Sequence, residues 1–331
     1  MDLARMLERC RRDQWAPSDL NWSVKPRAMS REDESAIVQL FTDMAGIERL
    51  AGALFHEQEK RATDDPTLRA IFHSFVADEV RHAQVAQMLA DHYDVHHFRI
   101  YRTNPSLERF IPYFLDAIRL LSDDVANAYV TVGELILDIA LLRSIDDYVA
   151  DDMSAQAMHL INRDESRHIA IDYRMVEYYA SPEYARRMEA RETRRGAIET
   201  ARAYATFAGM LFHAQPFIRD VFLTPMDLVD PSGVRLREAF KRFQQLGAKP
   251  GVAARPFGRF MIGLQEMYLH PVIGPIFGGV LGRVSGVGGR FLERLNDPEE
   301  LEEAAKKSYE ELAQEALAAK RTPESSSRGH A

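Results

Sequence analysis

Cysteine is almost missing from this sequence. Cys10 is the single cysteine among 331 residues, so no disulfide can form within one chain and no cysteine-based metal site can be built. Basic patches are missing as well, and the net charge is −8 with a pI near 5.8. A chain of this charge without clustered Lys and Arg is poorly suited to nucleic acid. We therefore expect no nucleic-acid partner.

Long hydrophobic runs and strand patterns are also rare. No stretch of 18 apolar residues free of charge occurs, so no membrane-spanning helix is expected. The first residues, MDLARMLERCRRDQWA, mix acids with arginines and lack the apolar segment of a secretory signal. A reducing cytoplasm is therefore the expected location. The scarcity of strand signals predicts an all-α fold.

A five-residue motif, Asp-Glu-x-Arg-His, occurs twice, at residues 78–82 and at residues 164–168. Within each copy a carboxylate and an imidazole stand three residues apart, as Glu79 does from His82 and Glu165 from His168. Side chains at i and i+3 share one face of a helix. Both side chains of a pair can therefore reach one metal ion.

Each copy follows, at a distance of 31 residues, a glutamate inside an apolar run. A buried carboxylate without a partner either takes a raised pKa or demands a cation. Two lone glutamates and two Glu-x-x-His pairs are the ligand set of a two-metal carboxylate site inside a four-helix bundle. The predicted metal ligands are Glu48, Glu79, His82, Glu134, Glu165 and His168. The alternative is that Glu48 and Glu134 only pair with Arg81 and Arg167.

The chemistry of these side chains indicates which metal they would hold. Four carboxylates and two imidazoles, with no thiolate, suit hard or borderline divalent ions that keep open coordination positions. The sequence therefore predicts two iron ions, with manganese as an alternative, and does not fit structural zinc.

The Asp and Arg of each motif are expected to support the ligands. Asp78 and Asp164 each lie four residues before the histidine of their own copy, on nearly the same helix face. Each can accept the imidazole N–H that does not face the metal, and Arg81 and Arg167 can hold a carboxylate in place. The alternative for each arginine is an ordinary surface position.

The chain divides into four predicted parts. Residues 1–29 form an N-terminal arm, irregular around its tryptophans and prolines, that packs on the body. Residues 30–180 form a four-helix bundle, with helices at about 30–62, 65–92, 122–149 and 152–180 and a long crossover at 93–121. Residues 181–319 add helices that pack on the bundle, and residues 320–331 form a disordered tail.

The C-terminal part is read in more detail from its prolines and glycines. A helix opened by Ser181 and Pro182 is expected to run to about Val221 with a break at Pro216. Residues 223–258 are expected to be broken around one short helix, and an acidic helix is expected at 297–319. For residues 259–290 two interpretations stay open. The segment is either a buried helix followed by irregular packing, or a cover on one end of the bundle that shapes an apolar substrate cavity.

The ligand pattern of residues 30–180 resembles the ferritin-like diiron-carboxylate superfamily. The Asp-Glu-x-Arg-His form is similar to that of its O2-activating members, such as acyl-carrier-protein desaturases, bacterial hydrocarbon monooxygenases and para-aminobenzoate N-oxygenase-like enzymes. The resemblance implies a ferritin-like bundle with two irons bridged by Glu79 and Glu165. It also implies Glu48 and Glu134 as terminal ligands and O2 as co-substrate at the open positions.

The sequence departs from these families at three positions. Ile161 stands where arylamine N-oxygenases carry an extra His ligand, and His159 lies off the ligand face. Ala86 stands where ribonucleotide reductase small subunits carry a radical Tyr. Asp138 occupies the face on which hydrocarbon monooxygenases tend to have a Thr. We weigh Asp138 equally as a catalytic proton relay and as a structural residue.

Two classes of function follow from these patterns. The first is an O2-dependent diiron oxygenase or oxidase that hydroxylates, N-oxygenates or desaturates a small organic or carrier-bound substrate. It would need an electron donor such as a ferredoxin or a reductase, and a homodimer is compatible with it. The second is a non-enzymatic, ferritin-like iron-binding or ferroxidase protein. The residues beyond the bundle favour the first class, because a minimal iron-storage bundle has no use for them.

Overall fold

The computed structural model describes residues 1–97, 101–192, 196–285 and 289–320, and this part of the chain contains helices and no strand. The prediction of an all-α fold is therefore confirmed. The predicted tail falls almost wholly on residues 321–331, which lie outside the described residues.

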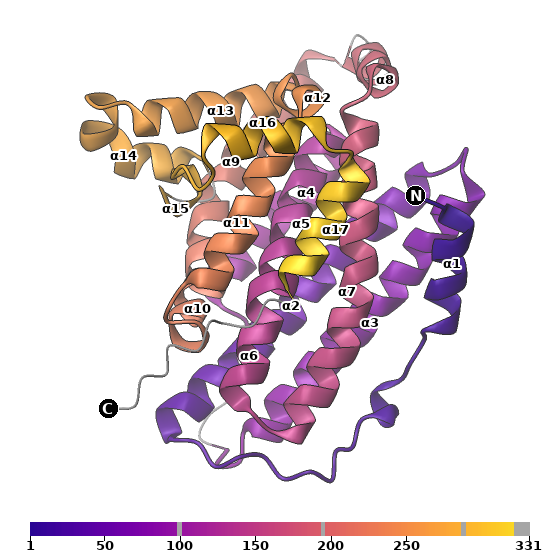
Figure 1. Cartoon of the computed structure of the whole chain (residues 1–331), viewed down its shortest axis with the longest axis vertical. Coiled ribbons are helices and arrows are strands. Elements are labelled where there is room, and N and C mark those ends of the chain that lie inside the picture. Colours follow the sequence, from indigo (N-terminus) through magenta and orange to yellow (C-terminus); the bar gives the residue numbers. More distant parts are fainter. Residues whose placement is uncertain (98–100, 193–195, 286–288, 321–331) are drawn as a thin grey trace.

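Four long helical stretches carry the candidate ligands, and we call them the core helices. They are α2 (Arg31–Arg61), α3 (Pro66–Tyr93), the continuous stretch α5–η2–α6 (Asp123–Leu135, Ile136–Leu141, Leu142–Val149) and α7 (Asp152–Tyr179). Their predicted bounds are correct to within a few residues because the caps were readable: Ser30 accepts from the Asp33 N–H, and Asp65 accepts from the first turn of α3. The core helices run side by side in Figure 1.

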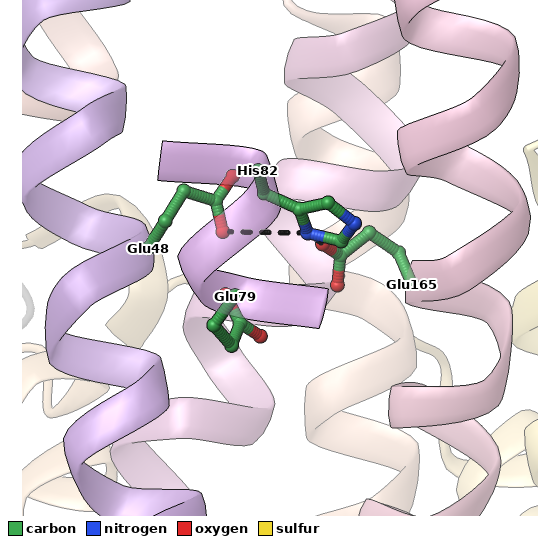
Figure 2. Close-up of side chains that lie close together, drawn as sticks. All are labelled: Glu48, Glu79, His82 and Glu165. Atoms are coloured by element: carbon green, nitrogen blue, oxygen red, sulfur yellow. Dashed lines mark ion pairs between the residues drawn. The ribbon is translucent and has the colours of Figure 1, made fainter. Parts of the chain in front are cut away.

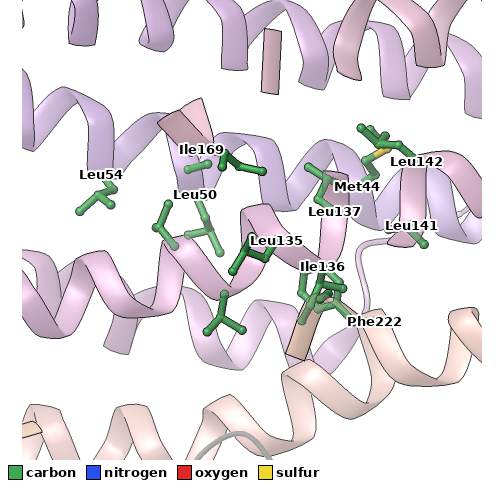
Figure 3. Close-up of a cluster of buried hydrophobic side chains, with 14 of the residues drawn as sticks. Met44, Leu50, Leu54, Leu135, Ile136, Leu137, Leu141, Leu142, Ile169 and Phe222 are labelled. Atoms are coloured by element: carbon green, nitrogen blue, oxygen red, sulfur yellow. The ribbon is translucent and has the colours of Figure 1, made fainter. Parts of the chain in front are cut away.

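The hydrophobic core lies between these helices. Figure 3 shows Leu50 and Leu54 of α2 facing Leu135 of α5, with Ile169 of α7 close by. All four side chains are buried. Each such side chain taken out of water contributes about 1.5–3 kcal/mol before conformational entropy is subtracted, so this core fixes the distances between the helices. The stretch 123–149 is apolar enough to cross a membrane, but 83% of its most apolar window is buried inside the protein. It is the core helix of this fold, and no clear membrane span is found among the described residues.

The third core helix is not a regular α-helix. Directly after Leu135 it widens into the π-helical segment η2 (Ile136–Leu141) before α6 resumes. A π turn accommodates one extra residue, which rotates every later side chain relative to the α-helical phase. The uniform periodicity assumed from sequence is therefore wrong beyond Glu134.

The N-terminal arm is more regular than predicted. Residues Leu3–Arg12 form helix α1, capped by Asp2, and Pro17–Asp19 form the short 3-10 turn η1. The arm packs on α3 and α7, where Trp15 donates to Asp164 and Arg163 donates to the backbone oxygen of Asp13. It therefore covers the core helices on the side of the repeated motif.

The segment between α3 and α5 contains α4 (Pro105–Leu120), which packs against α9 (Ala197–Phe217) and α2. The single helix expected from Ser181 to Val221 is instead α8 (Pro182–Glu192) and the separate α9. No break occurs at Pro216, because the chain continues into a second π segment, η3 (Ile218–Leu223). Proline lacks the backbone N–H that an α-helix would use at this position, and the wider π turn lets the helix continue past it.

Residues 224–253 hold more helix than the one short helix expected. They form α10 (Thr224–Val229), α11 (Val234–Gly247) and α12 (Pro250–Ala253), and α11 packs on α5 and η2. The predicted acidic helix is two helices, α16 (Pro298–Lys306) and α17 (Tyr309–Ala319), because Ser308 caps a new start. Helix α17 packs on α7.

Neither interpretation of residues 259–290 is correct as a whole. The segment forms the helices α13 (Pro256–Leu269) and α14 (Ile273–Val284), a hairpin that projects from the rest of the molecule in Figure 1. The short helix α15 (Gly289–Leu292) follows it. The hairpin is regular rather than irregular, and most of its surface is exposed rather than buried. Helix α13 nevertheless lines an apolar cavity, as the second interpretation expected.

Lys320 falls in the predicted tail, but its side chain is buried against α7 and η2. Its side chain is 8% exposed, and its ammonium group donates to both carboxylate oxygens of Asp138 at 3.0 and 3.1 Å. It also donates to the backbone oxygen of Asn162 and to Ser166. The end of α17 is therefore tied to α7 and η2 by a buried ion pair.

Replacing Lys320 with Met should lower the free energy of unfolding by about 3–5 kcal/mol, because Asp138 would be left buried without its partner. The double variant Lys320→Met/Asp138→Asn should recover most of that loss. Lys306→Met, at a side chain that is 77% exposed, is the matched control and should change little. Urea denaturation of the four proteins checks this, and equal losses at positions 320 and 306 would contradict it.

Candidate metal centre

The structure brings together all six side chains that the sequence singled out as ligands. They form two overlapping groups, in each of which one ligand atom per residue lies within 4.8 Å of the others. The first group is Glu48, Glu79, His82 and Glu165, and the second is Glu79, Glu134, Glu165 and His168. Figure 2 shows the first group converging from three core helices. Glu79 and Glu165 belong to both groups, so each lies between two potential metal positions.

Local helix geometry and small residues create this convergence. Glu79 and His82 stand on one face of α3, and Glu48 faces them from α2. Gly52 lies one turn after Glu48, and a side chain there would begin 3.1 Å from the Cβ of Glu79. A larger residue at this position would therefore force Glu79 to shift by a few tenths of an ångström.

Aromatic rings hold His168 in its orientation. The ring of Phe75 lies 4.2 Å from that of His168 between centroids, and the ring of Phe55 lies 5.1 Å away. Both phenylalanines are fully buried. These two rings restrict the rotation of the His168 imidazole, so its two nitrogens have fixed and different surroundings.

Both histidines turn Nδ1 toward the carboxylates. Nδ1 of His82 lies 2.9 Å from Glu165 Oε1 and 3.9 Å from Glu48 Oε2. Nδ1 of His168 lies 3.1 Å from Glu79 Oε1 and 3.0 Å from Glu165 Oε2. Nδ1 is therefore the atom that each histidine offers to a metal.

The Nε2 atoms correct the predicted pairing with the aspartates. Nε2 of His82 lies 3.2 Å from Asp164, and Nε2 of His168 lies 3.5 Å from Asp78. Each histidine therefore faces the aspartate of the other motif copy, not that of its own. The two motif copies face each other across the interface between α3 and α7. The aspartate on the opposite helix is therefore nearer to each histidine than the aspartate four residues before it on the same helix.

The two arginines lie between the same aspartates. Arg167 donates to Asp78 at 3.1 Å and to Asp164 at 2.7 Å, and Arg81 contacts the same two carboxylates. Arg167 is almost fully buried, so the surface alternative is wrong for it. Among the described residues neither arginine pairs with Glu48 or any other candidate ligand, which removes the alternative to metal binding proposed from sequence. The arginines hold the aspartates that hold the histidines.

The N-terminal arm covers this network, a role that the sequence did not reveal. The indole N–H of Trp15 donates to Asp164 at 2.7 Å, and its ring lies over the Arg81 guanidinium. Gln14 accepts from Arg81 at 3.1 Å. In the sequence, this covering role is indicated only by two tryptophans in an otherwise polar arm.

The pKa values of the carboxylates in the cluster differ strongly from their usual values. Burial, together with the nearby Glu165, raises the pKa of Glu48 to about 7. Burial and neighbouring carboxylates raise the pKa values of Glu79 and Glu134 well above their usual range. Glu165 lies between both imidazoles, and despite its burial these contacts hold its pKa well below the usual value. The protein alone therefore neutralises only part of the buried negative charge.

Several buried atoms of the cluster have no hydrogen-bond partner. They include both carboxylate oxygens of Glu79, one oxygen each of Glu48, Glu134 and Glu165, and Nδ1 of His82. Unpaired buried polar atoms are costly and rare in folded proteins. Two divalent cations would satisfy these atoms together, so the residues present fit a two-metal centre.

Asp138 is fully buried one turn beyond Glu134. Both of its oxygens accept from Lys320, which also contacts Asn162 and Ser166 of α7. This ion pair favours the interpretation of Asp138 as a structural residue over that of a proton relay. Burial raises the pKa of Asp138 to about 6.

Asp172 of α7 is a further buried acidic residue outside the predicted ligand set. It lies one turn beyond His168 and is fully buried, with neither oxygen in a well-formed hydrogen bond. Burial raises its pKa to about 8. A chain of buried polar groups leads to its neighbour Thr131, since Gln58 donates to Asn127 at 3.0 Å and Asn127 donates to Thr131 at 3.2 Å.

Two apolar cavities flank α5. A small one of about 60 Å³ is lined by Glu48, Glu134 and apolar residues of α2, α4, α5, α9 and η3. A larger one of about 530 Å³ lies at the base of α13 and includes Thr131 and Tyr179 in its lining. The cavity that borders the ligands is thus shaped by α4 and α9, and residues 259–290 shape only the larger one.

Comparisons with known proteins identify no relative: no protein-family model, no curated protein and no solved structure matches this chain. The class of protein that the site defines therefore depends on its geometry alone.

The metal-free protein should lose stability as the pH rises from about 5 to 8. Folding raises the pKa of Glu48 to about 7 and that of Asp172 to about 8. Carboxyls that are protonated in the folded state contribute stability fully below their unfolded pKa, and this contribution is lost as the pH rises through the folded value. The raised pKa values of His82 and His168 act in the same direction.

At ~1.4 kcal/mol per pKa unit, the free energy of unfolding of the metal-free protein should fall by roughly 2 kcal/mol or more over this range. Urea denaturation at several pH values measures it. Added Fe(II) should remove the decline, because metal binds the ionised carboxylates. A Glu48→Gln/Asp172→Asn variant should show a flatter profile. A metal-free stability that rises with pH would refute the assignment.

The crossed pairing predicts which substitutions are coupled. Asp164→Asn should weaken Fe(II) binding by about 10–100-fold, because His82 loses the acceptor that fixes its Nε2–H, and Asp78→Asn should act through His168. In double-mutant cycles on Fe(II) affinity, Asp164→Asn should couple to His82→Ala and not to His168→Ala. Coupling of Asp78 to His82 would instead restore the pairing within one motif copy.

Proposed function

We propose that this chain is an O2-dependent, non-haem diiron oxidoreductase of the ferritin-like type, acting on an apolar organic substrate. The observation that carries the proposal is the pair of overlapping ligand groups that share Glu79 and Glu165. A shared pair of carboxylates between two positions, each with its own imidazole, is the arrangement that a two-metal carboxylate site requires. The proposal includes the bundle topology, since such sites are built from facing helices.

The donor set supports iron over other metals. Oxygen and imidazole donors without thiolate favour iron or manganese, and six protein side chains around two ions leave coordination positions open. When bound, two irons would supply the redox chemistry and the activation of O2. The protein's own share is to hold ligands, exclude water and manage protons.

Residues of this chain fit each of these tasks. Glu79 and Glu165 would bridge the ions, with Glu48 and Glu134 at either end and both histidines bound through Nδ1. Asp164 is hydrogen-bonded to Nε2 of His82, and Asp78 lies 3.5 Å from Nε2 of His168. The apolar walls of α4, α9 and η3 exclude water beside Glu48 and Glu134.

A proton source is present beside the ligands. With a pKa of about 8, Asp172 carries a proton on its carboxyl at neutral pH. Asn127 donates to Thr131 Oγ1, and the neighbouring Thr131 hydroxyl would pass a proton to Asp172 after that carboxyl gives up its own. Thr131 also borders the larger cavity, so this chain of groups runs toward a space that water can enter.

The cavities support an apolar substrate. The one beside Glu48 and Glu134 is small and almost entirely apolar, and suits O2 or one reacting end of a hydrocarbon group. An iron-storage protein has no need of apolar cavities formed by helices outside the core, so the enzyme is favoured over the ferroxidase alternative.

The test is anaerobic loading with Fe(II) followed by exposure to O2. We expect about two irons per chain, rapid O2 consumption, and a coupled diferric pair in the Mössbauer spectrum. Glu79→Ala and Glu165→Ala should abolish the reaction, since each removes a shared ligand. Asp91→Asn, at an exposed acid on the same helix as Glu79, should leave it unchanged.

Iron that accumulates far beyond two ions per chain after repeated exposure to O2 would favour the storage alternative. A loaded protein that does not react with O2 would refute both functions.

A further inference from the structure

The α13–α14 hairpin exposes an unusual amount of apolar surface. Half of the large hydrophobic side chains that are exposed in the described part of the chain, eight of sixteen, lie between residues 262 and 284. Leu264 is the one residue of α13 that is buried, and Gly282 the one of α14. Contiguous exposed apolar surface of this kind marks a contact with another molecule or with a membrane.

In helix α14 the small residues lie on the packed face and the large apolar residues on the exposed face, the reverse of a helix that packs in water. Gly274, Gly278 and Gly282 recur every four residues and form one stripe. This stripe faces α13: a side chain at Gly274 would overlap the backbone oxygen of Tyr268 at 2.1 Å, and one at Gly278 would contact the Tyr268 ring at 3.4 Å. Only glycine therefore allows the two helices to approach so closely.

The large side chains of α14 lie two residues away from the glycines, on the opposite face. Ile276 is 67% exposed, Val280 is 60% exposed and Val284 is also exposed. Small residues between helices and large apolar residues facing outward are the pattern of helix pairs surrounded by lipid. In water the same pattern costs free energy, so the hairpin is adapted to an apolar surrounding.

The charge around the hairpin indicates which apolar surrounding it meets. Residues 255–294 contain five arginines against two glutamates and no Lys or Asp, a formal charge of +3 in a chain whose net charge is −8. Arg259 and Arg283, on the hairpin itself, are both exposed. Basic residues beside an apolar surface are attracted to anionic phospholipids. The hairpin itself carries Arg259 and Arg283 against Glu266, so a second copy would meet a face of the same net positive sign, which electrostatic complementarity disfavours.

The length of the hairpin limits how it can sit in a membrane. Helix α14 has 12 residues, or about 18 Å at 1.5 Å per residue, whereas the hydrocarbon core of a bilayer is about 30 Å thick. The hairpin is therefore too short to span a bilayer and suits insertion into one leaflet.

We propose that the α13–α14 hairpin docks this protein on the surface of an anionic phospholipid bilayer. The stripe of Ile276, Val280 and Val284, with Phe277, enters the acyl region, and Arg259 and Arg283 contact the phosphate groups. Ile262 and Leu269 are exposed on the same hairpin and also line the 530 Å³ cavity.

The test is co-sedimentation of the full chain with vesicles of phosphatidylcholine and phosphatidylglycerol, and with pure phosphatidylcholine vesicles, at low and high salt. We expect binding to the anionic vesicles, weakened by salt and by removal of phosphatidylglycerol. Ile276→Ser/Phe277→Ser/Val280→Ser should lower the partition coefficient by more than about tenfold, because three large apolar side chains are no longer transferred from water into lipid.

The matched control is Val95→Ser/Val234→Ser, which removes two apolar side chains that are 55% and 59% exposed outside the hairpin. It should bind vesicles like the wild type, and circular dichroism should show both variants folded. Wild-type protein that stays in the supernatant at all lipid concentrations would overturn the proposal, as would a triple variant that binds like the wild type. A wild-type dimer that the triple variant converts to a monomer without lipid would assign the face to a second copy instead.

Discussion

Six ionisable side chains share one water-free space in this protein, and the rest of the structure is arranged around their charge. Four carboxylates cannot all ionise there unless positive charge accompanies them. Two imidazoles compensate Glu165, and the raised pKa values of Glu48, Glu79 and Glu134 measure what is left uncompensated. In the proposed function, divalent metal would supply the missing charge and would also satisfy the oxygens that have no hydrogen-bond partner.

Support for the ligands extends outward in layers. The aspartates fix the outer nitrogens of the histidines, the arginines fix the aspartates, and Trp15 covers both. Crossing the aspartates between the motif copies links α3 to α7 through the site itself. A change in either helix is therefore felt by both metal positions, as expected of a centre that must keep two ions in register.

Much of the fold and of the site could be predicted because its signals are local. Ser30 and Asp65 are caps that can be read within four residues, and the Glu-x-x-His spacing places each ligand pair on one helix face. What failed depended on non-local geometry. The π turn after Leu135 interrupts the regular α-helix, and no composition signal marks such a turn. Lys320 lay in a stretch of tail-like composition, and its partner is 182 residues away.

The exposed hairpin was misjudged for a related reason. Apolar composition predicted burial, but burial is decided by which face of a helix meets the protein. In α14 that face is glycine, so the apolar residues point outward. The glycines at 274, 278 and 282 were visible in the sequence, but a stripe of small residues does not reveal what lies on either side of it.

The most direct measurement of the central claim is anomalous diffraction at the iron edge from crystals of the Fe(II)-loaded protein. The account predicts two separate peaks in each chain. One should lie among Glu48, Glu79, His82 and Glu165, and the other among Glu79, Glu134, Glu165 and His168. A single peak, or none, with Nδ1 of His82 hydrogen-bonded to Glu165, would contradict it.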